Sequence, residues 1–231
     1  MPKVICVVQA RLKSTRLPRK VLADLHGKPL IDHVIQRAQA VKGIDLVVLN
    51  VPDTDRELQV GRACPVYPVR NQEQDVLGSY LQVAEWARAD IIVRLTGDCP
   101  LLAVDIVERA VAAYKYIGFG EKLNYLPVCM PYVPVADGWD CEIFSMGLLQ
   151  LANHEAKANQ REHVTTWMRE SGDANITKIP SPSLSDWTAL KCSVDTTGDL
   201  ERVRKIVAYL PHDDNFGHET IWDAWQRAGR P

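Results

Sequence analysis

Short apolar runs alternate with segments of helical periodicity through the first half of the chain. Four continuous runs have the length and composition of buried strands, at residues 4–8, 46–51, 66–69 and 91–95. Between and after them lie segments in which apolar residues recur every three or four positions, as in helices, at 30–41, 76–88 and 104–116. Strands that alternate with helices predict an α/β fold whose mainly parallel sheet is covered on both faces.

The second half of the chain has a less regular pattern. Residues 123–144 contain three prolines among short β-like pieces. Helices are predicted at 146–157 and 161–170, and one more strand at 190–194. Because the chain shows neither an internal repeat nor a linker, we predict a single domain with a small inserted β-rich lobe.

A further helix is predicted to begin within residues 195–199 and to run to about residue 209. Thr196 and Asp199 have the spacing of a capping box, in which each side chain satisfies a backbone donor of the other residue. Trp222 and Trp225 are expected to anchor a C-terminal helix to the body of the protein.

Composition restricts the class of protein. The 231 residues are 46% hydrophobic and 24% charged, as in globular proteins, and the net charge is −2. A nucleic-acid-binding protein would normally carry a basic face, so we expect no nucleic-acid partner. No apolar stretch is long enough to span a membrane, and the run after Lys3 is too short for a signal peptide. The six cysteines form no CxxC pair, which favours buried free thiols in the cytoplasm over disulfides or a zinc site.

The segment 9–20, QARLKSTRLPRK, concentrates positive charge directly after the first predicted strand. It holds five cations and no acid, namely Arg11, Lys13, Arg16, Arg19 and Lys20. Open α/β sheets bind ligands at the carboxyl ends of their strands, and a triphosphate would supply matching negative charge. The alternative is a run of charge that only meets solvent. The chain lacks both the P-loop and the GxGxxG pattern, so phosphate binding would depend on side-chain charge and backbone amides.

Two aspartates follow other predicted strands. Asp98 lies in the turn Thr-Gly-Asp-Cys-Pro after the strand at 91–95, and Asp195 follows the strand at 190–194. Their structural alternatives are a turn aspartate that binds its own backbone and a helix cap. Thr196 is better placed than Asp195 to cap the helix. Paired carboxylates beside a cationic loop are suited to hold Mg²⁺, so we expect a magnesium-dependent nucleotide site.

Six short motifs in order resemble one family. They are QARLKSTRLP at 9–18, GKPL at 27–30, RLTGDCPL at 94–101, DGWDCEIF at 137–144, REHVT at 161–165 and VDTTGDLERV at 194–203. Together they resemble the spore-coat polysaccharide cytidylyltransferase-like family, which is similar to 3-deoxy-manno-octulosonate and acylneuraminate cytidylyltransferases. The motifs span nearly the whole chain.

This resemblance implies a fold and an activity. The fold is a three-layer Rossmann-like nucleotidyltransferase of the glycosyltransferase-A type. The activity is transfer of CMP from CTP to a sugar or sugar acid with release of pyrophosphate, in the synthesis of surface polysaccharide or glycoconjugate precursors. The family also implies Mg²⁺ and a homodimer in which residues 123–180 bind the acceptor and the second subunit.

The resemblance also assigns roles to residues of this chain. Catalysis and triphosphate binding fall to Arg11 and Lys20, together with Ala10, Ser14 and Arg16 of the same loop. Asp98 and Asp195 fall at the metal, with Thr96 beside Asp98 as a nucleotide contact. The base and ribose would meet Arg70, Asn71 and Asp75. The acceptor would meet Asp137, Asp140, Glu142, Arg161, Glu162 and His163.

The chain departs from the family pattern at two places. Lys13 and Arg19 stand where the family usually has glycine, and a left-handed conformation at Lys13 would be strained. Asp-Thr-Thr-Gly-Asp replaces the family's Asp-Thr-Pro-Glu-Asp but retains Asp195. The literal DxD of Asp53 and Asp55 is interpreted as a capping turn.

Two other functions remain open from the sequence. One is a glycosyltransferase of the same sheet type, whose carboxylate pair would hold a metal on a nucleotide-diphosphate sugar. The other is a nucleotide-binding regulator without catalysis. The identity of the acceptor, and the choice of cytosine over another base, do not follow from the sequence.

Overall fold

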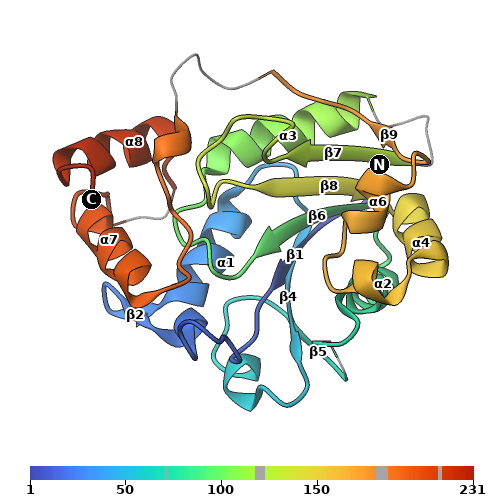
Figure 1. Ribbon diagram of the computed structural model, residues 1–231, viewed down its shortest axis with the longest axis horizontal. Coiled ribbons are helices and arrows are strands. Elements are labelled where there is room, and N and C mark those ends of the chain that lie inside the picture. Colours follow the sequence, from blue (N-terminus) through green and yellow to red (C-terminus); the bar gives the residue numbers. More distant parts are fainter. Residues whose placement is uncertain (71, 118–122, 181–186, 213–214) are drawn as a thin grey trace.

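In a computed structural model, the chain forms one seven-stranded sheet with helices on both faces (Figure 1). The structure describes residues 1–70, 72–117, 123–180, 187–212 and 215–231. The sheet has the order β5-β4-β1-β6-β8-β7-β9. Its strands are β1 (Val4–Gln9), β4 (Leu46–Pro52), β5 (Val66–Val69), β6 (Ile91–Thr96), β7 (Asn124–Val128), β8 (Cys141–Ser145) and β9 (Asn175–Ile176). The predicted α/β class is confirmed, and so are the four strands predicted in the first half of the chain, β1, β4, β5 and β6.

The first four strands of this order are parallel, and this places their carboxyl ends at one edge. β1 pairs in parallel with β4 on one side and with β6 on the other. β8 then pairs antiparallel with β6, and β7 antiparallel with β8. The segment that we predicted as β-rich therefore adds its strands to the main sheet, at the side of β6.

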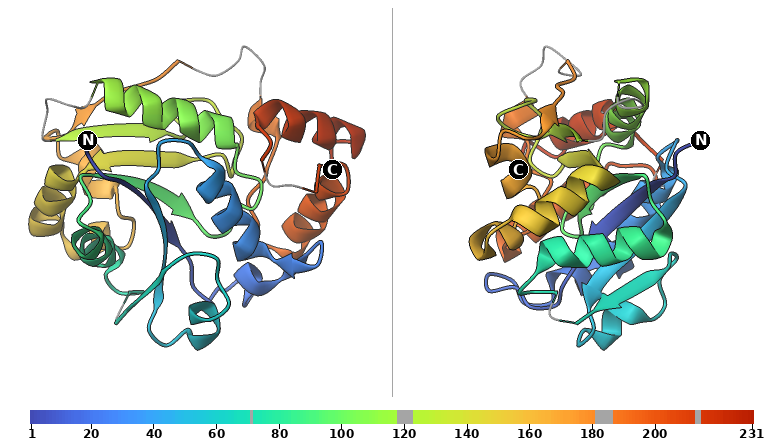
Figure 2. Two further views of the ribbon diagram at one scale, coloured as in Figure 1. Left: turned by 180° about the vertical axis from the view of Figure 1, so that it is seen from behind. Right: turned by 90° about the vertical axis from the view of Figure 1, so that its right-hand side faces the viewer.

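Helices cover the two faces of the sheet, as the alternation of side chains along β1 requires (Figure 2). Val4, Cys6 and Val8 point to the face packed against α1 (Leu30–Ala40) and α3 (Val104–Ile117). Ile5 and Val7 point to the other face, which packs against α2 (Val76–Ala87) and α4 (Met146–Glu155). These five side chains are inaccessible to solvent, so β1 forms the centre of both cores.

The C-terminal helices extend the first of these cores. α7 (Thr197–Val207) and α8 (His218–Arg227) pack beside α1 and α3 at one end of the molecule (Figure 1). The predicted capping box at the start of α7 is confirmed, because the side chains of Thr196 and Asp199 each accept from the backbone of the other. Trp225 is buried and Trp222 packs against the same core, as expected.

Two predicted elements are wrong. The helix predicted over 161–170 is two short ones, α5 (Ala158–Arg161) and α6 (Thr166–Glu170), because the chain turns between them to bury Val164 and Thr165. The strand predicted at 190–194 is absent from the described sheet. That segment makes a single bridge, between Asp137 and Lys191, and then separate backbone bonds instead of a ladder.

The remaining pieces are small. Near the first loop are a one-turn helix η1 (Lys20–Leu22) and a two-strand ribbon of β2 (Asp24–Leu25) and β3 (Lys28–Pro29). Two further single turns are η2 (Arg56–Gln59) and η3 (Trp187–Ala189). All six cysteines are free thiols. Over the described residues, none of the helices combines the length and apolar character needed to cross a bilayer.

Candidate active site

The cationic loop leaves β1 at the carboxyl edge of the parallel strands and is held there by backbone bonds. The amide of Ala10 donates to the Asn50 carbonyl of β4 at 3.1 Å, and the amide of Arg19 closes the loop on the Leu12 carbonyl at 2.9 Å. The Leu12 amide donates to the carboxylate of Asp55 at 2.7 Å. The loop therefore has a defined path although most of its side chains are exposed.

Asp55 has a role that the sequence did not reveal. We interpreted Asp53 and Asp55 as a capping turn, but the side chain of Asp55 makes no capping bond to η2. It is 6% exposed and accepts from the loop instead. Its position after β4, one strand away from the loop, is the signal that could have indicated this contact.

Asp55→Ala is expected to loosen the loop. Loss of this buried acceptor leaves the Leu12 amide without its partner, which should cost about 1–3 kcal/mol of unfolding free energy. Urea denaturation measures that loss, and a raised KM for the nucleotide would report the disordered loop. Asp53→Ala is the matched control, because the described residues offer the Asp53 side chain no hydrogen bond. Equal effects of the two substitutions would contradict the assignment.

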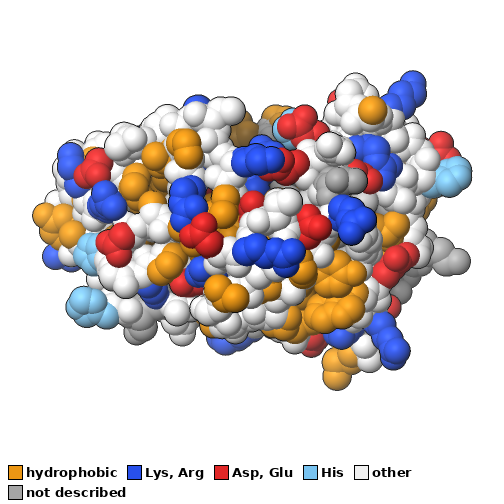
Figure 3. Space-filling model, turned by 90° about the horizontal axis from the view of Figure 1, so that it is seen from below, with side chains coloured by type: hydrophobic (Ala, Val, Ile, Leu, Met, Phe, Trp, Pro, Cys, Tyr) orange, Lys and Arg blue, Asp and Glu red, His pale blue; other side chains and the backbone are white. Residues whose placement is uncertain are grey.

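The loop cations are divided between acids at the surface and the site itself. Lys13 pairs with Glu73 at 2.9 Å, and Arg19 pairs with Glu57, both in exposed positions. Arg16 instead pairs with Asp195 at 2.8 Å. Seen from below, basic and acidic side chains consequently lie next to one another on this face (Figure 3). Within the described chain, neither the Arg11 nor the Ser14 side chain has a hydrogen bond or ion pair.

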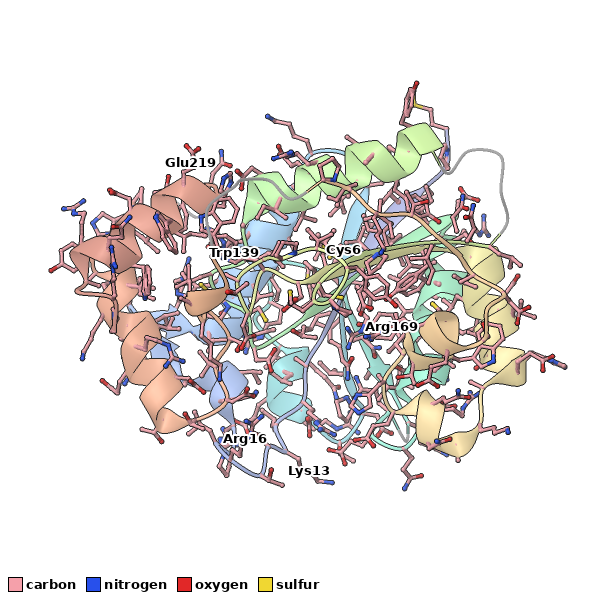
Figure 4. All side chains as sticks on the ribbon, turned by 45° about the horizontal axis from the view of Figure 1, so that its top comes forward. Cys6, Lys13, Arg16, Trp139, Arg169 and Glu219 are labelled. Atoms are coloured by element: carbon pink, nitrogen blue, oxygen red, sulfur yellow. The ribbon has the colours of Figure 1, made fainter. Side chains whose placement is uncertain are left out.

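Of the two positions where glycine is usual in the family, only Arg19 takes the conformation that favours glycine. Its φ is 60°, whereas Lys13 is absent from the described residues with positive φ. Lys13 and Arg16 both extend from the loop at the end of the sheet (Figure 4). The expected strain therefore lies at Arg19, directly before Lys20, and not at Lys13.

Lys20 joins the two predicted metal carboxylates. Its Nζ donates to Asp98 Oδ2 at 2.8 Å and to Asp195 Oδ1 at 2.9 Å. Burial alone would lower the pKa of Lys20, but the two carboxylates outweigh it and raise the pKa. Burial would likewise raise the pKa of Asp98, yet the charge and hydrogen bond of Lys20 bring it below its ordinary value. Lys20 and Asp98 are therefore both charged at neutral pH.

Close backbone packing fixes Asp98 at the end of β6. The amide of Gly97 donates to the Gln9 carbonyl at 2.8 Å. A Cβ at Gly97 would lie 2.8 Å from the Ala10 Cβ and 2.9 Å from that carbonyl, so this approach requires glycine. Ala10 is itself buried. The motif TGDCP thus brings the turn of Asp98 against the beginning of the cationic loop.

Asp195 reaches the site through an extended segment that binds both neighbouring turns. The Val194 amide donates to the Asp98 carbonyl at 2.9 Å, and the Cys192 amide donates to the Asp137 carbonyl at 2.6 Å. Asp199 then accepts from the Asp195 and Thr196 amides at 3.0 and 2.9 Å. The segments that carry Asp98 and Asp195 are therefore joined by one backbone bond rather than by strand pairing.

Asp199 is expected to hold this segment only while it is ionised. Burial would raise its pKa, but hydrogen bonds from Arg202 and from the Asp195 amide lower it well below the ordinary value. Because the folded-state pKa is depressed, its stabilisation is complete above the unfolded pKa of about 4 and is lost as the pH falls below it. Asp199→Asn should remove that part of the acid dependence of unfolding. Unchanged pH profiles of urea denaturation for this variant would contradict it.

A divalent cation fits Asp98 and Asp195. One ammonium nitrogen lies within hydrogen-bond distance of both carboxylates, so a single cation can reach the two. Among the described residues, no group of three or more acidic, histidine or cysteine side chains forms a complete metal cage. Mg²⁺ accepts such a partial site, because it takes one or two carboxylates and completes its shell with water and phosphate oxygens.

A cavity of about 440 Å³ includes Thr96, the last residue of β6, in its wall. Its polar lining consists of Arg94, Thr96, Asp137, Asp140, Glu142, Arg169 and Thr188. Three of the residues assigned to the acceptor therefore share one cavity with Thr96, the last residue of β6. Burial, with the neighbouring Asp137 and Glu142 carboxylates, raises the pKa of Asp140 to about 6, against the opposing bond from the Gly138 amide.

Glu142 is the centre of a buried network in the wall of this cavity. Its carboxylate accepts from Arg94 at 2.6 Å, from the Thr165 hydroxyl at 2.7 Å and from the Tyr125 hydroxyl. Arg169 lies 3.5 Å away on the same carboxylate. Sequence analysis missed Arg94 and Arg169. Arg94 is two residues before Thr96 in β6, and side chains two residues apart in a strand point to the same face. The sequence could therefore have placed Arg94 beside Thr96.

The other predicted contacts lie apart from the cavity lining. Arg161 forms a bidentate pair with Asp75, with both distances 2.9 Å, and also binds Asn153. Asp75 in addition caps α2 through the Gly78 amide. Their roles within the free protein are thus to brace α2 against α5. Arg70, Glu162 and His163 are exposed, and Asn71 lies outside the described residues.

Comparison with known proteins identifies the class. Residues 5–171 match the family described as Cytidylyltransferase. A 3-deoxy-manno-octulosonate cytidylyltransferase of Anaeromyxobacter dehalogenans is 36% identical over 118 residues, 49% of this chain and 48% of the relative. The chain thus spans about half the length of such curated relatives.

Solved structures have the same fold. A cytidylyltransferase from Leptospira borgpetersenii has a TM-score of 0.87 at 25% identity, over 100% of this chain and 96% of that one. A CMP:2-keto-3-deoxy-manno-octonic acid synthetase solved with CTP has a TM-score of 0.66 at 21% identity, over 89% and 98%. Rv0371c from Mycobacterium tuberculosis, solved with manganese, has a TM-score of 0.62 at 18% identity, over 88% and 98%.

The fold and the family match define an enzyme of the nucleotidyltransferase class. The chain belongs to the cytidylyltransferase family.

Proposed function

We propose that this enzyme transfers CMP from CTP to a hydroxyl group of a sugar or sugar acid, with Mg²⁺ and with release of pyrophosphate. The product would be an activated precursor of a surface polysaccharide or glycoconjugate. The observation that carries the proposal is the ion-pair cluster of Lys20, Asp98 and Asp195 at the carboxyl edge of the parallel strands, beneath the cationic loop. The relative solved with CTP supports the choice of nucleotide.

The reaction would be an in-line displacement at the α-phosphorus of CTP. The acceptor oxygen forms a bond to this phosphorus, and the bond from phosphorus to the bridging oxygen of the β-phosphate breaks. Pyrophosphate leaves with that electron pair, and the hydroxyl proton passes to solvent. Arg11, Arg16 and Lys20 would neutralise the departing phosphates, since their charges lie on the loop at the same edge.

Asp98 and Asp195 would hold the divalent ion, and a bound Mg²⁺ would neutralise charge on the α-phosphate and polarise the attacking oxygen. Lys20 contacts both carboxylates in the free protein. The lysine would therefore turn toward the phosphates when the nucleotide enters with its metal. The manganese-bound relative supports a divalent ion at this fold.

Nucleotide binding and transfer test the proposal separately. Thermal shift with the four nucleoside triphosphates, each with Mg²⁺, should give the largest stabilisation with CTP, because a ligand that binds the native state raises the melting temperature. Pyrophosphate release should then require CTP, Mg²⁺ and a hydroxylated acceptor together. Stabilisation by CTP without any release from a broad set of sugars and sugar acids would favour a nucleotide-binding regulator instead.

A further inference from the structure

The cavity at the end of β6 has an unusual balance of charge for an acceptor that carries a carboxylate. Its lining includes three carboxylates, Asp137, Asp140 and Glu142, and two guanidinium groups, Arg94 and Arg169. Both arginines are paired with Glu142, at 2.6 and 3.5 Å. The charge that remains unpaired in the cavity is therefore negative, and the phosphates of the nucleotide would add to it.

Asp137 and Asp140 are the groups with free hydrogen-bonding capacity. Asp140 accepts one bond, from the Gly138 amide at 3.2 Å. Over the described part of the chain, the carboxylate of Asp137 has neither a hydrogen bond nor an ion pair. Carboxylate oxygens accept hydrogen bonds, so these two aspartates are suited to a ligand with donors. Hydroxyl and ammonium groups are donors, whereas a ligand carboxylate would face like charge.

The backbone fixes these aspartates beside the reacting centre. A Cβ at Gly138 would lie 2.6 Å from the Ser193 amide, so residues 137 and 138 pack directly on the segment that leads to Asp195. The Asp137 carbonyl accepts from the Cys192 amide of that segment. A ligand bound to Asp137 and Asp140 would consequently lie next to the metal carboxylates, as an attacking hydroxyl requires.

Arg169 does not cancel the excess of negative charge in the cavity. Its side chain is 33% exposed, but its guanidinium also donates to the Thr165 hydroxyl at 2.7 Å. Thr165 in turn donates to Glu142, which is 3% exposed and depends on its cationic partners for its charge. A second carboxylate would compete with Glu142 for Arg169, and separating a buried acid from its partner is costly.

We infer that the acceptor is a polyhydroxylated sugar or amino sugar without a carboxylate, whose donors are recognised by Asp137 and Asp140. This inference rests on the proposed function and narrows its acceptor class. It differs from the acid acceptor named for the relatives that this chain resembles, because the charge of its cavity disfavours an acid.

Binding of matched ligand pairs in the presence of Mg²⁺ and α,β-methylene-CTP tests the inference. Each pair differs only in a carboxylate, such as glucose against glucuronate, or 3-deoxy-manno-octulosonate against the same compound with its carboxylate reduced to an alcohol. Glucosamine serves as the amino member. Calorimetry should show the uncharged or amino member of a pair bound at least about tenfold more tightly, since like charges oppose association.

A double variant provides the reciprocal test. Asp137→Asn with Asp140→Asn keeps the shape of both side chains but removes their charge. The ratio of the affinity for the uncharged or amino member to the affinity for the acid should therefore fall at least about tenfold. Asp173→Asn, in an exposed loop, is the control and should retain the wild-type preference. Tighter binding of the acid by the wild type, or no binding of any uncharged or amino member while the CTP analogue binds, overturns the inference. Failure of the CTP analogue itself would instead overturn the proposed function.

Discussion

Asp98→Asn is expected to lower pyrophosphate release by about 10²–10³-fold while the protein remains folded. The substitution keeps the shape of the side chain but removes the negative charge that Lys20 binds at 2.8 Å and that would hold the divalent ion. Turnover with CTP and a working acceptor measures the effect. Manganese binding in the presence of CTP, followed by electron paramagnetic resonance, should weaken in parallel and provides a readout that does not depend on the acceptor.

The matched control is Asp223→Asn, an exposed position of α8 remote from the sheet edge. It should leave turnover, manganese binding and the melting temperature unchanged. An Asp98→Asn enzyme with wild-type turnover would rule out the metal role. Lost turnover with undiminished manganese binding would also do so, and would leave Asp98 as a partner of Lys20 alone.

Lys20→Met is expected to move nucleotide transfer and metal affinity in opposite directions. Loss of the ammonium removes a contact to the departing phosphates, so kcat/KM for CTP should fall by about 10²-fold. The same loss leaves the carboxylates of Asp98 and Asp195 facing each other without their shared cation. Because Lys20 occupies the position between them in the free protein, its removal should strengthen manganese binding in the absence of nucleotide.

Lys205→Met, an exposed lysine of α7, controls for the loss of one positive charge. It should change neither quantity. Weaker manganese binding by the Lys20→Met variant without nucleotide would contradict the view that lysine and metal compete for the same two carboxylates. A merely structural role of Lys20 would lower stability and activity together without any gain in metal affinity.

The sequence determined those features that depend on local pattern. The period of apolar residues placed strands β1, β4, β5 and β6 and helices α1, α2 and α3 within two residues of their observed bounds, because burial on one or both faces fixes that period. The capping box of α7 followed from Thr196 and Asp199 alone. The cationic loop and the two aspartates could be assigned to one sheet edge because carboxyl ends of parallel strands meet there.

Contacts between segments distant in the chain were decided only by the tertiary structure. Lys20 bridges Asp98 and Asp195 across 78 and 175 positions of sequence, and Arg161 turns to Asp75 over 86. Asp55 holds the loop rather than a helix end, and residues 190–194 join two turns instead of forming a strand. In each case the sequence alone offered several possible hydrogen-bond partners for the side chain or amide. Only the packing of the sheet selected one, because a hydrogen bond forms where burial brings donor and acceptor together and excludes water.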